Sequence, residues 1–335
     1  MKKTRLIQPL LLALAAALSC GAAQAQSSLN LGNYSVSATY ALDRLNGTSG
    51  GISGLEASAV TYARDRNSLF FVGDEGTGVV EISLTGQTLG HMNFDWTSTG
   101  SAKHDTESLT YLGNGQLVVG EERLYDAYKF SYVNGGSAKL VNAGVSISND
   151  NVGNDGMEGL SYDPRNGGSF VAVKQDVPED VKAGTLSFGA SLSGTANMST
   201  LFDPTKLGLS TLSDVAVLST VDAFAGTAVA DHLLFLSLGS RMLVEADRNG
   251  NVISSFDLSN VVPHNGIEGV TIDEKGTIYL VAEQAQDGSI SADLAQSQLI
   301  VLSPTAAVPE PASATLMMIG ALSLLSLARR RCQQR

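Results

Sequence analysis

The feature that most constrains the fold is a pattern that occurs five times along the chain. Each copy has an acidic or serine-containing lead, an apolar strand, a turn rich in Asp, Asn and Gly, and a second apolar strand. The first strands end at Tyr62, Tyr111, Tyr162, Val217 and Ile272, which are 49 to 55 residues apart. This spacing suits the four-stranded blade of a β-propeller and exceeds the length of a leucine-rich or ankyrin repeat.

Two further apolar strands follow in most copies, for example at 79–84 and 88–94. The fifth copy shows only one more strand, at 298–303, whereas an alternating strand at 34–40 precedes the first copy. We therefore predict an all-β, five-bladed propeller over residues 26–307, in which the N-terminal strand completes the last blade. That closure would remove two exposed sheet edges. A β-sandwich is the alternative fold, but it does not require this period.

The N-terminus has the features of a secretory signal peptide. Basic residues precede an apolar run at 10–18, and small residues end at Ala25, which predicts a Sec signal peptide over residues 1–25. Lipidation at Cys20 is an alternative, although Ala17 stands where a lipobox has an aliphatic residue.

The C-terminus carries a second apolar segment. Pro309-Glu310-Pro311 precedes an apolar run at 312–328, and three arginines follow, which predicts a short transmembrane helix with a cytoplasmic end. Residues 308–335 resemble a PEP-CTERM sorting signal. The resemblance implies that an exosortase cuts near the Pro-Glu-Pro motif and releases the body to the cell surface or extracellular matrix. A permanent single-helix anchor is the alternative, and it also places the body outside the cytoplasm.

Charge and cysteine content exclude several classes of protein. Residues 26–308 contain 14 basic and 32 acidic residues, a net charge of −18. So acidic a body is a poor partner for phosphate backbones, and nucleic acid is not expected as a ligand. The two cysteines, Cys20 and Cys332, lie in the terminal segments, which excludes an internal disulfide framework or a structural zinc cluster.

Acidic residues recur at one position of the repeat. In a propeller, the first strand of each blade lines the central channel, so the leads of these strands meet at one mouth, together with the ends of the second strands. The candidate metal ligands in the leads are Glu107, Glu158 and Glu268 at one register, Glu56 and Asp105 two positions earlier, and Asp214 one position away. The second strands end at Asp74-Glu75, Glu121-Glu122, Lys174-Gln175, Ser240 and Glu283-Gln284.

Carboxylates gathered around a narrow opening repel one another unless raised pKa values or a bound cation neutralise them. Calcium accepts six to eight oxygen ligands in flexible geometry, so we expect Ca²⁺ at this mouth. The alternative is that these side chains accept hydrogen bonds from the backbone of the neighbouring blade and tie the ring together.

The sequence contains no phosphate-binding loop of Walker spacing. His104 and His264 stand just before the leads of the second and fifth copies, so they are placed to reach the same mouth. Trp96 and Phe94 are expected to cover a blade edge or a loop core.

Several of these segments together resemble the SdiA-regulated family over roughly residues 50–303. The resemblance is carried by Asp105-Thr106-Glu107, by Val119-Gly120-Glu121-Glu122-Arg123, by Gly156-Met157-Glu158-Gly159-Leu160-Ser161-Tyr162 and by Ile267-Glu268-Gly269-Val270. It implies a five-bladed propeller distantly related to NHL-repeat proteins, with bound calcium and no established reaction. The chain departs from the family at Gln175 and at Gly239-Ser240-Arg241, where an acidic residue is usual. A weaker similarity to phytase-like esterase propellers rests on the shared leads and on Gly73-Asp74-Glu75-Gly76.

Two functional hypotheses follow. The first is an exported, calcium-binding module that binds or scaffolds exopolysaccharide or another surface ligand. The second is a calcium-dependent hydrolase, a lactonase or a phytase-like phosphoesterase, in which His104 or His264 moves the proton. A sensor or signalling protein is not separable from the first hypothesis by sequence.

Overall fold

The computed structural model describes residues 27–42, 56–148, 153–175, 179–285 and 296–305. The predicted signal peptide, the sorting signal and the apolar segment at 312–328 lie outside these residues. Within the described residues, no helix is long and apolar enough to cross a membrane.

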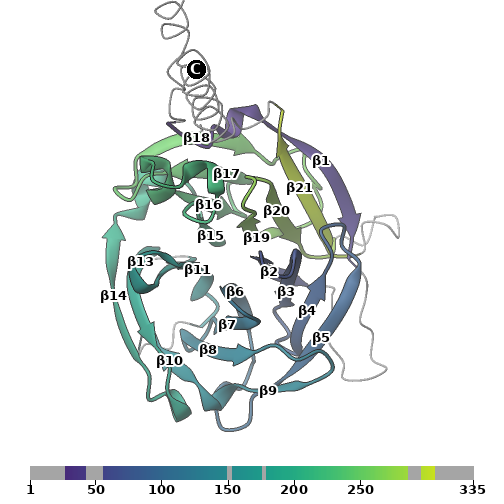
Figure 1. Ribbon diagram of the computed structural model, residues 1–335, viewed down its shortest axis with the longest axis vertical. Helices are drawn as coiled ribbons and strands as arrows, with labels where there is room; N and C mark the ends of the chain where they lie inside the picture. The colour runs from purple at the N-terminus through teal and green to yellow at the C-terminus, as the bar shows by residue number, and fades with distance from the viewer. Residues whose placement is uncertain (1–26, 43–55, 149–152, 176–178, 286–295, 306–335) are drawn as a thin grey trace, which may run out of the picture. The chain divides into compact units, whose positions relative to one another are not determined.

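The described strands form five sheets arranged as a ring, which confirms the predicted five-bladed, all-β propeller (Figure 1). The first two blades contain β2 (Ala57–Ala63), β3 (Ser68–Gly73), β4 (Gly78–Ile82) and β5 (Thr88–Asp95), and then β6 (Thr106–Gly113), β7 (Gln116–Glu121), β8 (Asp126–Ser131) and β10 (Gly144–Ser146). The third contains β11 (Met157–Asp163), β12 (Ser169–Lys174), β13 (Asp180–Ser187) and β14 (Thr195–Phe202).

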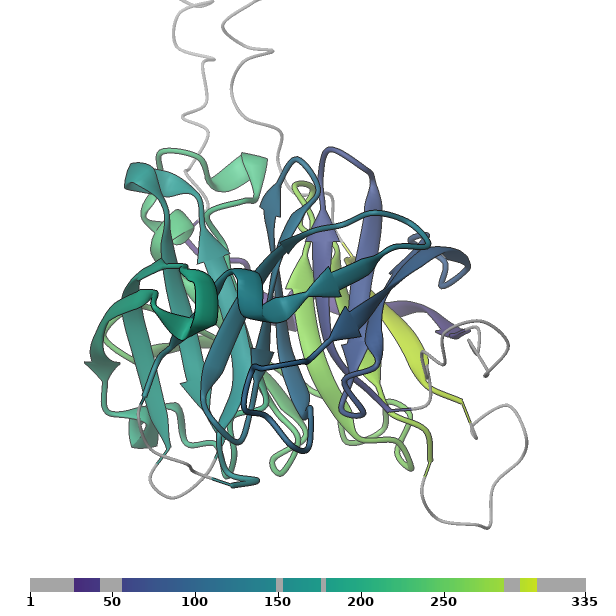
Figure 2. The ribbon, with the colours of Figure 1, turned by 90° about the horizontal axis from the view of Figure 1, so that it is seen from below.

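The fourth blade contains β15 (Asp214–Val217), β16 (Leu233–Ser237), β17 (Met242–Ala246) and β18 (Val252–Asp257), and the fifth contains β19 (Ile267–Ile272), β20 (Ile278–Ala282), β21 (Gln298–Pro304) and β1 (Tyr34–Ala41). The first strand of each repeat is innermost, so β2, β6, β11, β15 and β19 surround the axis (Figure 1). The view from the side shows the strands running between the two faces of the ring (Figure 2). Helical structure among the described residues is limited to short 3₁₀ segments of three or four residues.

Closure of the ring follows the prediction. Strand β1 pairs antiparallel with β21, from Tyr34 opposite Pro304 to Ala41 opposite Gln298. The Tyr34 hydroxyl also donates a hydrogen bond to the Gly276 carbonyl, at 2.8 Å. The first and last parts of the propeller therefore share one sheet, and the joint is made of many ladder hydrogen bonds.

The first blade differs from the prediction because it has a fifth strand. The segment between β8 and β10 leaves the second blade, and β9 (Ser137–Lys139) pairs in parallel with the edge strand β5. Side chains pack beneath this crossover: the Phe94 and Phe130 rings lie 5.3 Å apart, and Trp96 and Tyr128 lie 5.6 Å apart. Trp96 is 8% exposed and packs in a core shared by the first and second blades.

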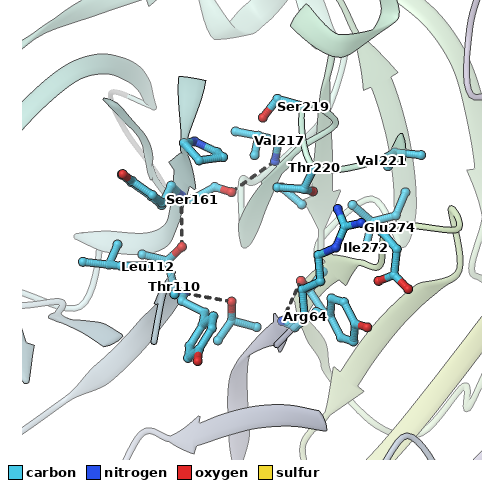
Figure 3. Close-up of a pocket in the computed structure, with 18 of the residues that line it drawn as sticks. Arg64, Thr110, Leu112, Ser161, Val217, Ser219, Thr220, Val221, Ile272 and Glu274 are labelled. Carbon is cyan, nitrogen blue, oxygen red and sulfur yellow. Dashed lines mark hydrogen bonds between the residues drawn. The ribbon is translucent and has the colours of Figure 1, made fainter. Parts of the chain in front are cut away.

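A regular set of hydroxyl groups joins the innermost strands. At one repeat position, a Thr or Ser hydroxyl oxygen accepts a hydrogen bond from a backbone N–H of the neighbouring blade (Figure 3). These bonds join Tyr111 N to Thr61 at 3.1 Å, Tyr162 N to Thr110 at 2.9 Å, Val217 N to Ser161 at 3.1 Å and Tyr62 N to Thr271 at 3.1 Å. The fourth blade has Ala216 at this position and cannot make the bond. The same hydroxyl-to-backbone hydrogen bond therefore joins neighbouring blades at four of the five seams.

Candidate functional site

A β-bulge lies near the start of four of the five innermost strands. The pairing between the first and second strands passes over one residue in each of these blades, namely Ser58, Glu107, Glu158 and Glu268. A bulge leaves one residue out of the ladder and re-aims its side chain. Three glutamates at the predicted register are thereby released from the sheet. Strand β15 begins at Asp214 and has no such bulge.

Glycines next to two of these glutamates allow the innermost strands to approach closely. A Cβ atom on Gly159 would lie 2.7 Å from the Cα atom of Asp214, and one on Gly269 would lie 2.9 Å from the Cα atom of Ala59. Only glycine fits where two backbones come this close. In Glu158-Gly159 and Glu268-Gly269, the glutamate therefore points out of the ladder, and the glycine allows the neighbouring innermost strand to approach closely.

The re-aimed glutamates open into a cavity of about 200 Å³ at one end of the channel, the acidic mouth. Its ten lining residues are Glu56, Ser58, Asp74, Glu107, Glu122, Asn154, Glu158, Gln175, Glu268 and Glu283. Seven of the ten are acidic, and no described Lys or Arg is among them. The first, second, third and fifth blades supply all of them, from the leads of the first strands and the ends of the second strands.

Asp105 lies beside this cavity. Oxygen atoms of Asp74, Asp105 and Glu107 lie within 4.8 Å of one another, as do oxygen atoms of Glu56, Asp74 and Glu75. Asp74 thus belongs to both groups. Asp105 Oδ2 also accepts a hydrogen bond from Arg123 Nε at 2.6 Å, so one carboxylate at the edge of the mouth is already paired with a cation.

Burial and mutual repulsion raise the pKa values of the carboxyl groups in the acidic mouth. Burial and then the neighbouring acids hold the pKa values of Glu107 and Glu158 well above the usual range. The same causes raise the pKa to about 8 for Asp74 and for Glu268. Burial also raises the pKa of Glu122 to about 7, although the Gly156 N–H donates to this carboxylate and opposes the shift. Without a cation, the cavity therefore retains protons near neutral pH.

Asp214 does not line the acidic mouth. Its carboxylate is buried at the seam between the fourth and fifth blades, where it accepts hydrogen bonds from Val215 N and Val270 N, both at 2.7 Å. Burial raises the pKa of Asp214, and these two hydrogen bonds oppose the rise. Asp214 thus ties two blades together, at the seam where Ala216 lacks a hydroxyl.

The two candidate histidines do not line the acidic mouth either. The His104 ring stacks on Trp96, with ring centroids 5.0 Å apart, beside a separate hollow that also includes Glu75. His264 is exposed in the loop before β19. Both residues precede a lead, as the sequence indicated, but neither is among the residues that line the cavity.

Sequence analysis did not predict that Asn154 lines the mouth. This residue lies in the loop before β11, and its Oδ1 accepts a hydrogen bond from Arg123 Nη2. Arg123 therefore links Asp105 to Asn154, across the seam between the second and third blades. The position of Arg123 directly after Glu121-Glu122 in the sequence was the one indication that a polar partner such as Asn154 would lie near the mouth.

Comparison with solved structures finds distant similarities. The chain is similar to glutaminyl cyclase from Myxococcus xanthus, with 12% identity, a TM-score of 0.49 and coverage of 81% of this chain and 96% of that chain. It is also similar to a luciferin-regenerating enzyme, with 11% identity, a TM-score of 0.44 and coverage of 79% and 95%, respectively. Among family models, the one described as SdiA-regulated matches residues 38–286.

Proposed function

The chain belongs to the SdiA-regulated family, and from the acidic mouth of its propeller we propose that it is an exported, calcium-binding module that binds or scaffolds a surface ligand. The observation that carries this proposal is the gathering of seven carboxylates from four blades in a cavity of about 200 Å³ that no described Lys or Arg lines. Such a set is stable only with protons or with a cation.

The donor set fits a calcium ion. Calcium takes six to eight oxygen ligands in flexible geometry, and the carboxylates that line this cavity would supply them. Glu107, Glu158 and Glu268 project from three blades, and Asp74 brings a buried Oδ1 that accepts no hydrogen bond within the described residues. Bound calcium would hold the blades together at the mouth and polarise an oxygen atom of a ligand that enters it.

Export completes the proposal. The signal peptide at 1–25 would direct the chain to the Sec machinery, and the Pro-Glu-Pro motif with the apolar segment at 312–328 would make it an exosortase substrate. The body would then lie at the cell surface or in the extracellular matrix. Calcium is available there, and an exopolysaccharide with hydroxyl or carboxylate groups would be a suitable ligand for a partly coordinated ion.

A calcium-dependent hydrolase is the second candidate, because buried carboxyl groups with raised pKa values are typical of active sites. A lactone suits this cavity better than a phosphate monoester, since no described Lys or Arg lines it to hold a phosphate dianion. Glu122 or Glu158 would then transfer the proton, because His104 lies in a separate hollow.

Metal analysis of the purified full chain tests the calcium site. We expect calcium to co-purify or to be taken up after chelation, and to raise Tm. At a hundredfold excess over Kd, the stabilisation should reach about 2.7 kcal/mol. Glu158→Gln should abolish most of the increase in Tm, whereas Asp257→Asn, on an exposed acid of β18, should leave it unchanged. A chain that takes up no calcium, with Tm insensitive to it, would contradict the proposal.

A panel of lactones and aryl phosphates separates the two candidates. Calcium-dependent turnover that Glu158→Gln removes would establish the hydrolase. Calcium uptake without turnover, together with calcium-dependent retention on an acidic polysaccharide, would establish the binding module.

A further inference from the structure

The channel has a second opening at the end opposite the acidic mouth. It is a cavity of about 620 Å³ around the ends of the innermost strands, and we call it the tyrosine mouth because Tyr62, Tyr111 and Tyr162 line it. Its volume is within the range of about 300 to 1,000 Å³ that is usual for sites that bind small molecules. The proposed calcium site does not include any residue of this cavity.

The lining of the tyrosine mouth combines apolar and charged side chains. Leu112 lies across the opening from Arg64 and Glu274 (Figure 3). Val217 and Ile272 extend the apolar lining at the ends of their strands. A ligand that fills this cavity must therefore carry both an apolar body and a polar group.

The charged wall has an excess of carboxylates. Asp65, Asp222 and Glu274 line the cavity with Arg64. Both terminal nitrogens of Arg64 donate to the carboxylate of Asp222 at 2.8 Å, so this guanidinium is already paired. The wall therefore carries a net negative charge after its own ion pair is formed.

Glu274 has an oxygen atom that needs a donor. Its side chain is only 16% exposed, and its Oε2 atom is buried with no hydrogen-bond partner among the described residues. Lys275 approaches only the other oxygen, Oε1, at 3.7 Å, and the lysine side chain is 75% exposed. Burial and then interaction with Glu274 raise the pKa of Tyr62, which also indicates a negative potential at this wall. A buried carboxylate oxygen without a donor is a costly arrangement that a ligand N–H group would relieve.

We propose that the tyrosine mouth binds a small organic cation, an amine or guanidinium group attached to an apolar body. The cationic group donates to Glu274 Oε2, and the apolar body packs against Leu112, Val217 and Ile272. Aromatic rings such as those of the three tyrosines add favourable interactions with a cation. This site is distinct from the acidic mouth and does not require calcium.

Calorimetric titration of the purified full chain tests the proposal. The probes are phenethylamine, the neutral phenethyl alcohol and the anionic 3-phenylpropionate, which share an apolar ring. We expect the amine to bind at least about tenfold more tightly than the other two, a difference of about 1.4 kcal/mol. Equal binding of the three probes, or no binding of the amine, would overturn the proposal.

Variants locate the binding site. Glu274→Gln should remove the preference for the amine, whereas Glu158→Gln at the acidic mouth and addition of a calcium chelator should leave it intact. Asp222→Asn releases Arg64 and should strengthen binding of the phenylpropionate. If Glu274→Gln does not fold, Thr220→Phe at the half-buried rim should block all three probes. Amine binding that survives both Glu274→Gln and Thr220→Phe would place the ligand elsewhere and refute the assignment.

Discussion

The two mouths of the channel are formed by opposite ends of the same innermost strands, and they differ in strand pairing and in the charge of the side chains that line them. At the acidic mouth, bulges at Glu107, Glu158 and Glu268 turn side chains out of the ladder into a small, highly charged cavity. At the tyrosine mouth, the pairing is regular at Tyr62 and Tyr162 and shifts only in β6, at Leu112, and the cavity is larger and mixed in character. A register shift of one residue thus turns a side chain out of the ladder and into a cavity, and at the acidic mouth three of the four shifted residues are glutamates.

The strongest test of this difference is the effect of pH on the metal-free chain. Burial raises the pKa of Asp74 and of Glu268 to about 8 in the folded protein, whereas unfolded carboxyl groups titrate near their ordinary values. The folded state therefore binds more protons, and its stability is fully present below the unfolded pKa and is lost as pH rises toward 8. We expect the Tm of the chelated chain to fall steadily between pH 5 and about pH 8.

Added calcium should suppress most of this fall, because the ion replaces the protons. Measuring Tm across this range with and without calcium checks the prediction. If the Tm of the chelated chain rises with pH, or the decrease persists when calcium is present, the acidic mouth does not carry the charge that we assign to it.

The second test adds a methyl group at the narrow seam of the acidic mouth. Gly159→Ala would place a Cβ atom 2.7 Å from the backbone of Asp214, so one strand must move. Overpacking of this kind destabilises by about 1 to 3 kcal/mol. Gly32→Ala is the control, because its Cβ atom would meet nothing closer than 3.5 Å. Denaturant unfolding measures both, and similar midpoints for the two variants would show that the seam is not tight.

The smallest effect is expected between the two mouths, where the hydroxyl groups tie the blades. Thr110→Val removes the acceptor for Tyr162 N and should destabilise the chain by about 1 kcal/mol. Thr110→Ser keeps the hydroxyl and should recover most of the loss. The measurement is the free energy of unfolding of both variants. If the Ser variant is as unstable as the Val variant, the loss comes from altered packing and not from the missing hydrogen bond.

Sequence periodicity predicted the ring, the number of blades and the closing strand, because each blade repeats the same order of a polar lead, an apolar strand, a polar turn and a second apolar strand. The repeat also predicted that Glu107, Glu158 and Glu268, at one register, and Glu56, two positions earlier, would share one mouth, and the structure brings them together. The calcium ion itself stays a prediction.

Other features depended on backbone geometry that a pattern of residue types does not specify. Asp214 stands one position from the common register, and this shift places it in a seam, where two backbone N–H groups hold it. The loop before β6 turns His104 onto Trp96, an outcome set by loop packing. The pairing of β9 with the neighbouring blade could not be predicted from the sequence either, because a strand of three residues is too short to show a periodic pattern.

The pairing of β1 with β21 has a consequence for how the molecule is made. Strand β1 (Tyr34–Ala41) can pair only after β21 (Gln298–Pro304) has been synthesised, so the last blade forms late in translation. At the end of this joint, Thr305 N donates to the Asn33 carbonyl at 2.6 Å. A truncated chain would keep two unsatisfied sheet edges. The ring can therefore close only when both β1 and β21 are present in the polypeptide.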